Sequence, residues 1–223
     1  TALNIYKQLD PQKMLHFAEE QTAAGNDSIA FEAYSYLASI ETDMAKKMDL
    51  CYRLAELKYQ QRDLPTTELI IEESLSLPFW KDKNLYYRST VGVKFRKLMA
   101  EIMLAKNEPV DSALVWLHEA RKFSRNNLET QEMDLEIARL YILSGEKKKA
   151  EDILQNITHN TLQEKKEYLT FLNTLLEGET ALADTLMNSF LIRHPESQYA
   201  NDAIYLMMFT LNMAEQDKKS FYS

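Results

Sequence analysis

Apolar residues recur three and four residues apart along most of the chain, which is the spacing of one face of an α-helix. These apolar stretches come in twos, with a short polar segment between them. Residues 140–154, LYILSGEKKKAEDIL, are typical: one stretch ends at Leu143, Gly145 follows, and a second stretch carries Ala150 and Leu154. Glycine adopts the left-handed conformation that ends a helix without a Cβ penalty. The pattern therefore predicts a helix, a turn at Gly145 and a second helix.

The same pattern occurs five times in the chain. Gly25 and Gly178 take the place of Gly145 in two copies, and Arg62 and Glu108 take it in two others. Five residues after each of these positions the sequence has a small residue: Ala30, Thr67, Ala113, Ala150 and Ala183. Successive small residues of this set are 33 to 46 residues apart. We expect the two helices of a pair to approach most closely at these small side chains. A single pair cannot bury its apolar faces alone, so the pairs are expected to stack.

The repeat predicts an all-α fold, a right-handed α–α superhelix of about five helix pairs and a final helix. We expect a single repeat domain over residues 1–223, with pairs at about 11–42, 43–78, 81–125, 129–158 and 162–194 and the final helix at 197–214. The longest interval contains an insertion, residues 77–92, rich in aromatic residues: Phe79, Trp80, Tyr86 and Tyr87. These rings either cover a core opened by the longer helix or anchor a partner.

The turn glycines and the small residues that follow them resemble the tetratricopeptide-repeat (TPR) family over nearly the whole chain. The resemblance implies a solenoid whose first helices line a concave, protein-binding face. The closing segment FLIRHPESQYANDAIYLM, residues 190–207, resembles bacterial cell-envelope TPR proteins. That points to the cell envelope or periplasm, with the cytoplasm as the alternative.

Composition and charge limit the classes of partner. Hydrophobic residues make up 45% of the chain, and the net charge is -8. An acidic chain is not expected to bind nucleic acid or anionic lipid. The longest uncharged stretch near the end of the chain, residues 203–214, is too short to span a bilayer, so no membrane insertion is expected. Because the sequence begins at Thr1, we expect it to be part of a longer protein.

The sequence contains no recognisable catalytic or metal-binding arrangement. His16, His118, His159 and His194 lie far apart, and none has a partner at metal-ligand spacing. The glycines are used as helix ends, which leaves none for a phosphate-binding loop. We therefore expect no enzyme activity, no cofactor and no metal. Cys51 has no second cysteine to pair with.

The candidate binding residues lie on the inner face of the first helices of the pairs, where apolar and aromatic residues are most frequent toward the C-terminus: Tyr52, Tyr59, Leu98, Leu135, Arg139, Tyr168, Leu172, Tyr205 and Phe209. They form a groove for an amphipathic or extended peptide, or they pack inside a tightly wound superhelix. The sequence thus predicts a non-catalytic protein-binding scaffold. The alternatives are a sensory or regulatory domain of a larger bacterial signalling protein and a solenoid that lends one wall to another domain's catalytic site. Self-association through the C-terminal helix is a further expectation.

Overall fold

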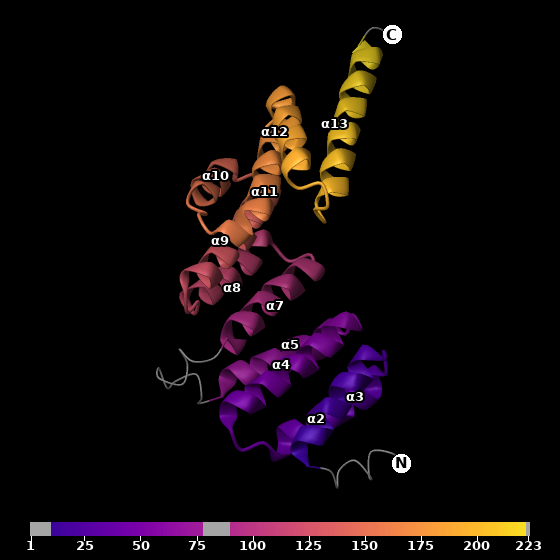
Figure 1. The fold of residues 1–223 in the computed structure, drawn as a ribbon, viewed down its shortest axis with the longest axis vertical. Coiled ribbons are helices and arrows are strands. Elements are labelled where there is room, and N and C mark those ends of the chain that lie inside the picture. Colours follow the sequence, from indigo (N-terminus) through magenta and orange to yellow (C-terminus); the bar gives the residue numbers. More distant parts are fainter. Residues whose placement is uncertain (1–9, 78–89, 222–223) are drawn as a thin grey trace. The chain divides into compact units, whose positions relative to one another are not determined.

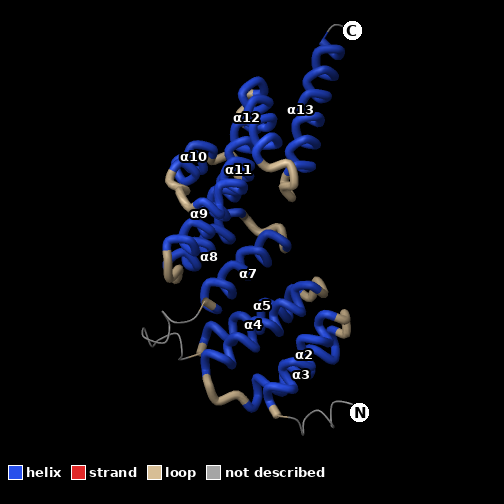
Figure 2. Tube along the Cα trace, viewed as in Figure 1, coloured by secondary structure: helices blue, strands red, loops and turns tan. Residues whose placement is uncertain are grey.

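The computed structural model describes residues 10–77 and 90–221, with side chains as far as residue 212. Within these residues it holds eleven α-helices and no β-strand (Figure 2). The all-α repeat fold expected from the sequence is confirmed. The chain divides into two compact units, residues 1–125 and 126–223, and each is described by itself. That residues 1–223 form one repeat domain stays a prediction.

The helices form five pairs and a final helix (Figure 1). The N-terminal unit contains three pairs: α2 (Pro11–Ala23) with α3 (Asp27–Ile40), α4 (Met44–Gln60) with α5 (Leu64–Ser76), and α7 (Val91–Ala105) with α8 (Val110–Lys122). The C-terminal unit contains two pairs and the final helix: α9 (Asn127–Leu143) with α10 (Lys147–Gln155), α11 (Gln163–Leu176) with α12 (Thr180–Arg193), and α13 (Ala200–Phe221). A short 3-10 helix, η2 (Asn160–Leu162), precedes α11. Within each unit a helix packs mainly on its neighbours along the chain, as in a solenoid.

Each pair turns at one residue in the left-handed region. Gly25, Gly145 and Gly178 have φ angles of +73°, +79° and +85°. At Gly145 the N–H of the next residue, Glu146, donates to the carbonyl of Tyr141 at 2.8 Å. This bond and the left-handed residue form a Schellman motif, which ends the first helix and directs the chain into the second.

Two of the five turns are made without glycine. Arg62, expected in the place of glycine, has a φ angle of 62°. In the third pair the left-handed residue is Asn107, with a φ angle of 57°, so the expectation of Glu108 is wrong by one residue. Pro109 caps the start of α8 and lengthens this turn, so Ala113 follows the left-handed residue one position later than in the other pairs. Asparagine is one of the few residues with a Cβ that visit this conformation routinely.

The small residues lie in the closest contacts between helices, as expected. All five residues that follow the turns are 0% exposed: Ala30, Thr67, Ala113, Ala150 and Ala183. In four pairs the residue seven positions before the turn on the first helix is also small, and it is at most 2% exposed: Ala18, Ala55, Ala100 and Ala138. Ala18 and Ala30 belong to one core cluster, and Ala138 and Ala150 belong to another. Alanine on both helices allows their backbones to approach.

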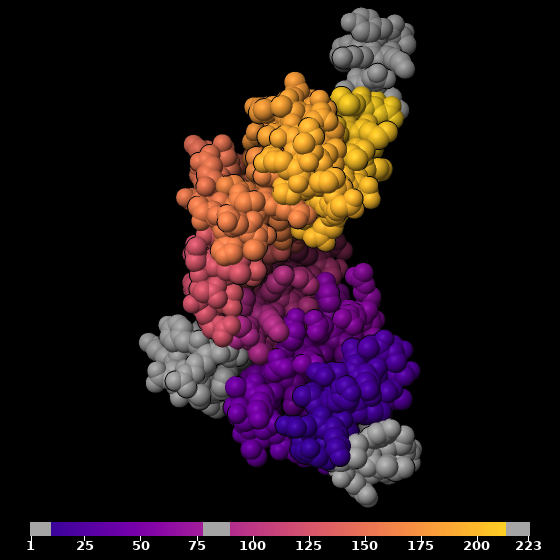
Figure 3. Space-filling view, viewed as in Figure 1, coloured from indigo at the N-terminus to yellow at the C-terminus, as the bar shows by residue number. Residues whose placement is uncertain are grey.

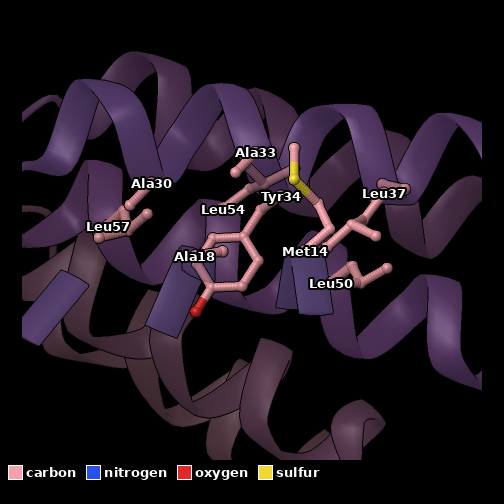
Figure 4. Close-up of a cluster of buried hydrophobic side chains, with 10 residues drawn as sticks. Met14, Ala18, Ala30, Ala33, Tyr34, Leu37, Leu50, Leu54 and Leu57 are labelled. Atoms are coloured by element: carbon pink, nitrogen blue, oxygen red, sulfur yellow. The ribbon is translucent and has the colours of Figure 1, made fainter. Parts of the chain in front are cut away.

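Apolar side chains at the joint between the first two pairs show how the pairs stack (Figure 4). Met14 from α2 and Tyr34 and Leu37 from α3 pack with Leu50 and Leu54 from α4 in one buried cluster. The first helix of the second pair therefore covers the open face of the first pair.

The final helix is longer than expected and continues to Phe221 rather than ending near residue 214. Residues 213–221 contain neither glycine nor proline, so the sequence offers no residue that stops the helix there. Ala203 and Met207 of α13 are buried against Phe171 of α11 and Ala183 of α12. The aromatic residues of the insertion, Phe79, Trp80, Tyr86 and Tyr87, lie outside the described residues.

We predict that Ala183→Leu destabilises the protein by about 1–3 kcal/mol, because extra volume at a fully buried contact forces the helices apart. The exposed Ala181, two residues earlier on the same helix, provides the control Ala181→Leu. Urea denaturation followed by circular dichroism measures both variants. Equal midpoints for the two variants would contradict the packing described here.

We predict that removing a glycine at one turn lowers the stability of the protein, whereas introducing a glycine at another turn raises it. Gly145→Ala should cost about 1 kcal/mol, because the left-handed conformation is strained for a residue with a Cβ. No atom lies within 4 Å of the added Cβ, so the cost comes from the backbone alone. Arg62→Gly should instead stabilise the protein, by less than about 1 kcal/mol, because it relieves the same strain. The measurement is the free energy of unfolding, and a loss of stability in Arg62→Gly would contradict the assignment of this turn.

Candidate functional site

The predicted groove residues lie on α4 and α7 in the N-terminal unit and on α9, α11 and the final helix α13 in the C-terminal unit. They therefore form two sets, one in each unit.

In the N-terminal unit the structure brings three predicted residues together. Tyr52 and Tyr59 of α4 and Leu98 of α7 line a depression of about 420 Å³, with Glu56, Gln60, Lys94, Lys97 and Glu101 as the other lining residues. Leu98 is only 4% exposed and belongs to the core beneath the depression. Leu98 therefore offers little surface to a partner, because it packs with Phe95 and Met99 of α7 in this core.

Tyr52 is held in place by contacts within this unit. Its hydroxyl donates to Glu56 Oε1 at 3.3 Å, and its ring meets the Phe95 ring edge-on, with the centroids 5.7 Å apart. The Lys94 ammonium lies over the ring, 5.2 Å from its centroid. Burial, and then the Glu56 carboxylate, raise the pKa of the Tyr52 hydroxyl well above its usual value. The hydroxyl is engaged with Glu56 and stays neutral to a higher pH than a free tyrosine does.

In the C-terminal unit the predicted residues differ in exposure. Leu135 of α9 is 1% exposed and packs in the core with α10 and α11, so it is not a groove residue. Arg139, Tyr168 and Leu172 are half-buried. Tyr205 and Phe209 of α13 are 68% and 55% exposed.

Tyr168 lies at the centre of an aromatic cluster. Its ring stacks on that of Tyr199, with centroids 4.6 Å apart and planes 14° from parallel. The rings of Phe171 and Phe190 each lie 6.4 Å from it. Burial, and then the Asp202 carboxylate on α13, raise the pKa of Tyr168 above its usual value. Tyr168 is thus partly a structural residue, in line with the alternative that these residues pack inside the superhelix.

Arg139 is positioned by an ionic contact with Glu136, a carboxylate that also binds Lys165. Its Nε donates to Glu136 Oε2 at 3.1 Å, and Lys165 of α11 donates to Glu136 Oε1 at 2.6 Å. The Glu136 side chain is only 13% exposed, so the two cations share one largely buried carboxylate. Burial raises the pKa of the Tyr199 hydroxyl, and the Glu136 carboxylate adds to this effect while the Arg139 guanidinium opposes it.

Sequence reasoning missed Tyr199, Glu136 and Lys165. Tyr199 lies in the connection just before α13, outside the helical pattern that selected the other residues. Glu136 and Lys165 are 29 residues apart, and no local spacing links them. Only the packing of α9 against α11 in the structure brings them together.

We group six half-buried or exposed residues of this unit under the name C-terminal inner face: Arg139, Tyr168, Leu172, Tyr199, Tyr205 and Phe209. On α13 the rings of Tyr205 and Phe209 stack with their centroids 6.5 Å apart. In the space-filling view α13 (yellow) lies against α12 at the surface of its unit (Figure 3).

In residues 10–77 and 90–212 no group of three or more histidine, cysteine or acidic side chains is placed to hold a metal ion. His194 contacts Glu167 Oε2 at 3.1 Å, and burial raises the pKa of the half-buried Cys51 thiol. None of the described helices has the length and apolar character needed to cross a membrane.

Comparisons with known proteins agree with this geometry. No protein-family model and no curated protein sequence matches the chain. A solved structure of a tetratricopeptide repeat protein from Parabacteroides merdae ATCC 43184 is similar, with a TM-score of 0.67 and 16% identity over 95% of this chain and 78% of that one. The TPR-like repeats of a putative kinesin light chain from Podosopora anserina are also similar. Their TM-score is 0.63 at 13% identity, over 85% of this chain and 99% of that one.

At these identities the likeness concerns the fold. Together with the repeated helix pairs, the left-handed turns and the buried small residues, it shows that the chain has a tetratricopeptide-repeat fold.

Proposed function

We propose that the protein is a non-catalytic scaffold that binds a partner protein or peptide on the C-terminal inner face. The observation that carries the proposal is the exposure of two large aromatic residues of α13, Tyr205 and Phe209, in the same unit as the half-buried Tyr168 and Leu172. Solenoids use such extended faces for binding. Contiguous apolar surface on a folded protein often marks an interaction site.

The chemistry of this face fits an apolar peptide segment better than a charged one. Glu136 already neutralises one of its two neighbouring cations, Arg139 and Lys165. Stacked aromatic rings give large contact area at low cost in side-chain entropy, which makes them good anchors. The partner is therefore an amphipathic helix or an extended segment with apolar side chains, and Arg139 supplies a polar contact at one edge.

The N-terminal depression around Tyr52 and Tyr59 is the second contact region in this proposal. Both charge signs line it, from Glu56 and Glu101 and from Lys94 and Lys97. It therefore suits a mixed polar segment of a partner rather than an apolar one.

The proposal also includes the cellular location of the protein. The resemblance of residues 190–207 to bacterial envelope proteins supports a place in the cell envelope. Fractionation of the source cells, with an antibody against the protein, tests this, and recovery only in the cytoplasmic fraction would contradict it.

The partner-binding prediction concerns the double variant Tyr205→Ala/Phe209→Ala. We expect the dissociation constant for the partner to rise at least ~30-fold, because buried aromatic anchors contribute about 2 kcal/mol or more. The melting temperature should stay unchanged, since both rings are exposed. Affinity capture and mass spectrometry identify the partner, and calorimetric titration of the purified partner measures binding.

The matched control is Ile192→Ala, an 81% exposed apolar residue on α12 outside the inner face. It should leave binding intact. Unchanged binding by the double variant would place the partner elsewhere. A turnover activity or a tightly bound small molecule in the purified protein would count against the scaffold itself.

A further inference from the structure

A cavity in the C-terminal unit lies apart from the C-terminal inner face. It has a volume of about 540 Å³ and is lined by α10, α11, the turn after α11 and the start of α12. The lining contains none of the six residues of the C-terminal inner face. Cavities of about 300–1,000 Å³ are typical of small-molecule sites. The unit therefore has space for a ligand outside the surface proposed for the partner protein.

Asn173 of α11 lines this cavity with a carboxamide that is only partly paired. The residue is 6% exposed, and its Nδ2 donates to the carbonyl oxygen of Lys147 at 3.4 Å, which fixes which end of the amide is the oxygen. Asn173 Oδ1 is buried and has no hydrogen-bond partner within the part of the chain that the structure describes. A buried oxygen without a donor is destabilising. The N–H group of a ligand would therefore bind favourably at this atom.

The other polar side chains of the cavity mostly offer acceptors as well. The hydroxyl of Thr174 donates to the carbonyl oxygen of Thr170, and the hydroxyl of Thr170 donates to the carbonyl oxygen of Lys166, each at 2.9 Å. A hydroxyl has one hydrogen, so both oxygens can only accept a further bond. The side-chain amide of Gln155 donates to Glu151 Oε1 at 3.1 Å. A ligand that fits this lining is a hydrogen-bond donor.

The charges of the lining favour a cation. Three carboxylates and one ammonium line the cavity, which gives it a formal charge of -2: Glu151, Glu177, Glu179 and Lys166. The Lys166 ammonium donates to the carbonyl oxygen of Ile157 at 2.8 Å, in the connection that follows α10. A ligand with two positive charges would balance the lining.

Two leucine side chains add apolar surface to the cavity, Leu154 of α10 and Leu182 of α12. Methylene groups of a ligand can pack on them. We propose that the cavity binds a short aliphatic diamine, in which a few methylene groups join two ammonium groups. The ammonium groups supply the donor that Asn173 Oδ1 lacks and balance the carboxylates, and the methylene groups contact the leucines.

The diamine should bind weakly and reversibly. Glu177, Glu179 and Leu182 are exposed, so water and salt reach part of the cavity and screen its charges. We therefore expect a dissociation constant on the order of 0.1 mM. Such a ligand leaves the protein during purification, and its binding is independent of the partner-binding face.

Calorimetric titration of the full chain with 1,4-diaminobutane tests the proposal. n-Butylamine has the same methylene chain and a single ammonium group. It should bind at least ~10-fold more weakly, because it balances only one of the two charges. Magnesium chloride at the same concentrations should not displace the diamine, since Mg²⁺ keeps most of its water shell and gains nothing from the leucines.

A pair of double variants tests the location of the site. Glu177→Gln/Glu179→Gln keeps the shape of both side chains and removes two charges, so the dissociation constant for 1,4-diaminobutane should rise at least ~10-fold. The matched control, Glu132→Gln/Glu196→Gln, removes two exposed carboxylates elsewhere in the same unit. It should change the dissociation constant by less than about twofold, because salt screens distant charges. Circular dichroism confirms that both variants keep their helix content.

The side-chain amide of Asn173 reports on the site without any substitution. Its nuclear magnetic resonance signal should shift saturably as 1,4-diaminobutane is added. The side-chain amide of Asn26, which donates to Gln21 Oε1 in the other unit, should not shift. Tyr205→Ala/Phe209→Ala should leave diamine binding unchanged, which separates this site from the partner-binding face.

No binding of 1,4-diaminobutane up to about 10 mM would overturn the proposal. Equal binding of n-butylamine, or displacement of the diamine by Mg²⁺, would also overturn it, because the cavity would then be an acidic surface only. An unchanged dissociation constant in Glu177→Gln/Glu179→Gln, or an unshifted Asn173 amide in a chain that binds the diamine, would contradict the assignment to this cavity.

Discussion

The close approach of two helices at a small residue is the constraint on which the rest of the structure depends. Alanine on both helices, as at Ala138 and Ala150, brings the backbones together and leaves no space at the centre of a pair. The larger apolar side chains must then point away from the pair, toward the next one. This is why a pair is not a complete folding unit and why its neighbours cover it.

The same constraint explains where exposed apolar surface remains. A first helix uses one face for its own second helix and a second face for the preceding pair. Its third face lines the inside of the solenoid. In α11 Tyr168 and Leu172 on this face are half-buried, whereas in α13 Tyr205 and Phe209 are exposed. The proposed binding face thus follows from the way in which the first helices pack in their unit.

Much of the fold could be predicted from the sequence, because the turn and the small residue are local signals. The repeat spacing predicted even the turn at Arg62, where the residue type gives no hint of a left-handed conformation. It missed the turn at Asn107 by one residue because Pro109 adds a position that the spacing alone does not reveal. The length of α13 was missed because no glycine or proline in residues 213–221 marks where the helix ends.

The site was less predictable than the fold. Apolar periodicity selects residues that face inward or toward a neighbouring pair, and it does not distinguish between these two directions. Leu98 and Leu135 face neighbouring helices and are buried, whereas Tyr205 and Phe209 are open. The shared carboxylate of Glu136 depends on residues from two helices and becomes visible only once they are packed side by side.

The central claim is that the final helix presents a binding face for a partner. Hydroxyl-radical footprinting with mass spectrometry tests it most directly, because it reports the solvent access of single side chains. Adding the partner should protect Tyr205 and Phe209, while Ile192 reacts equally with and without the partner. Protection of all these residues together, or of none of them, would contradict the account.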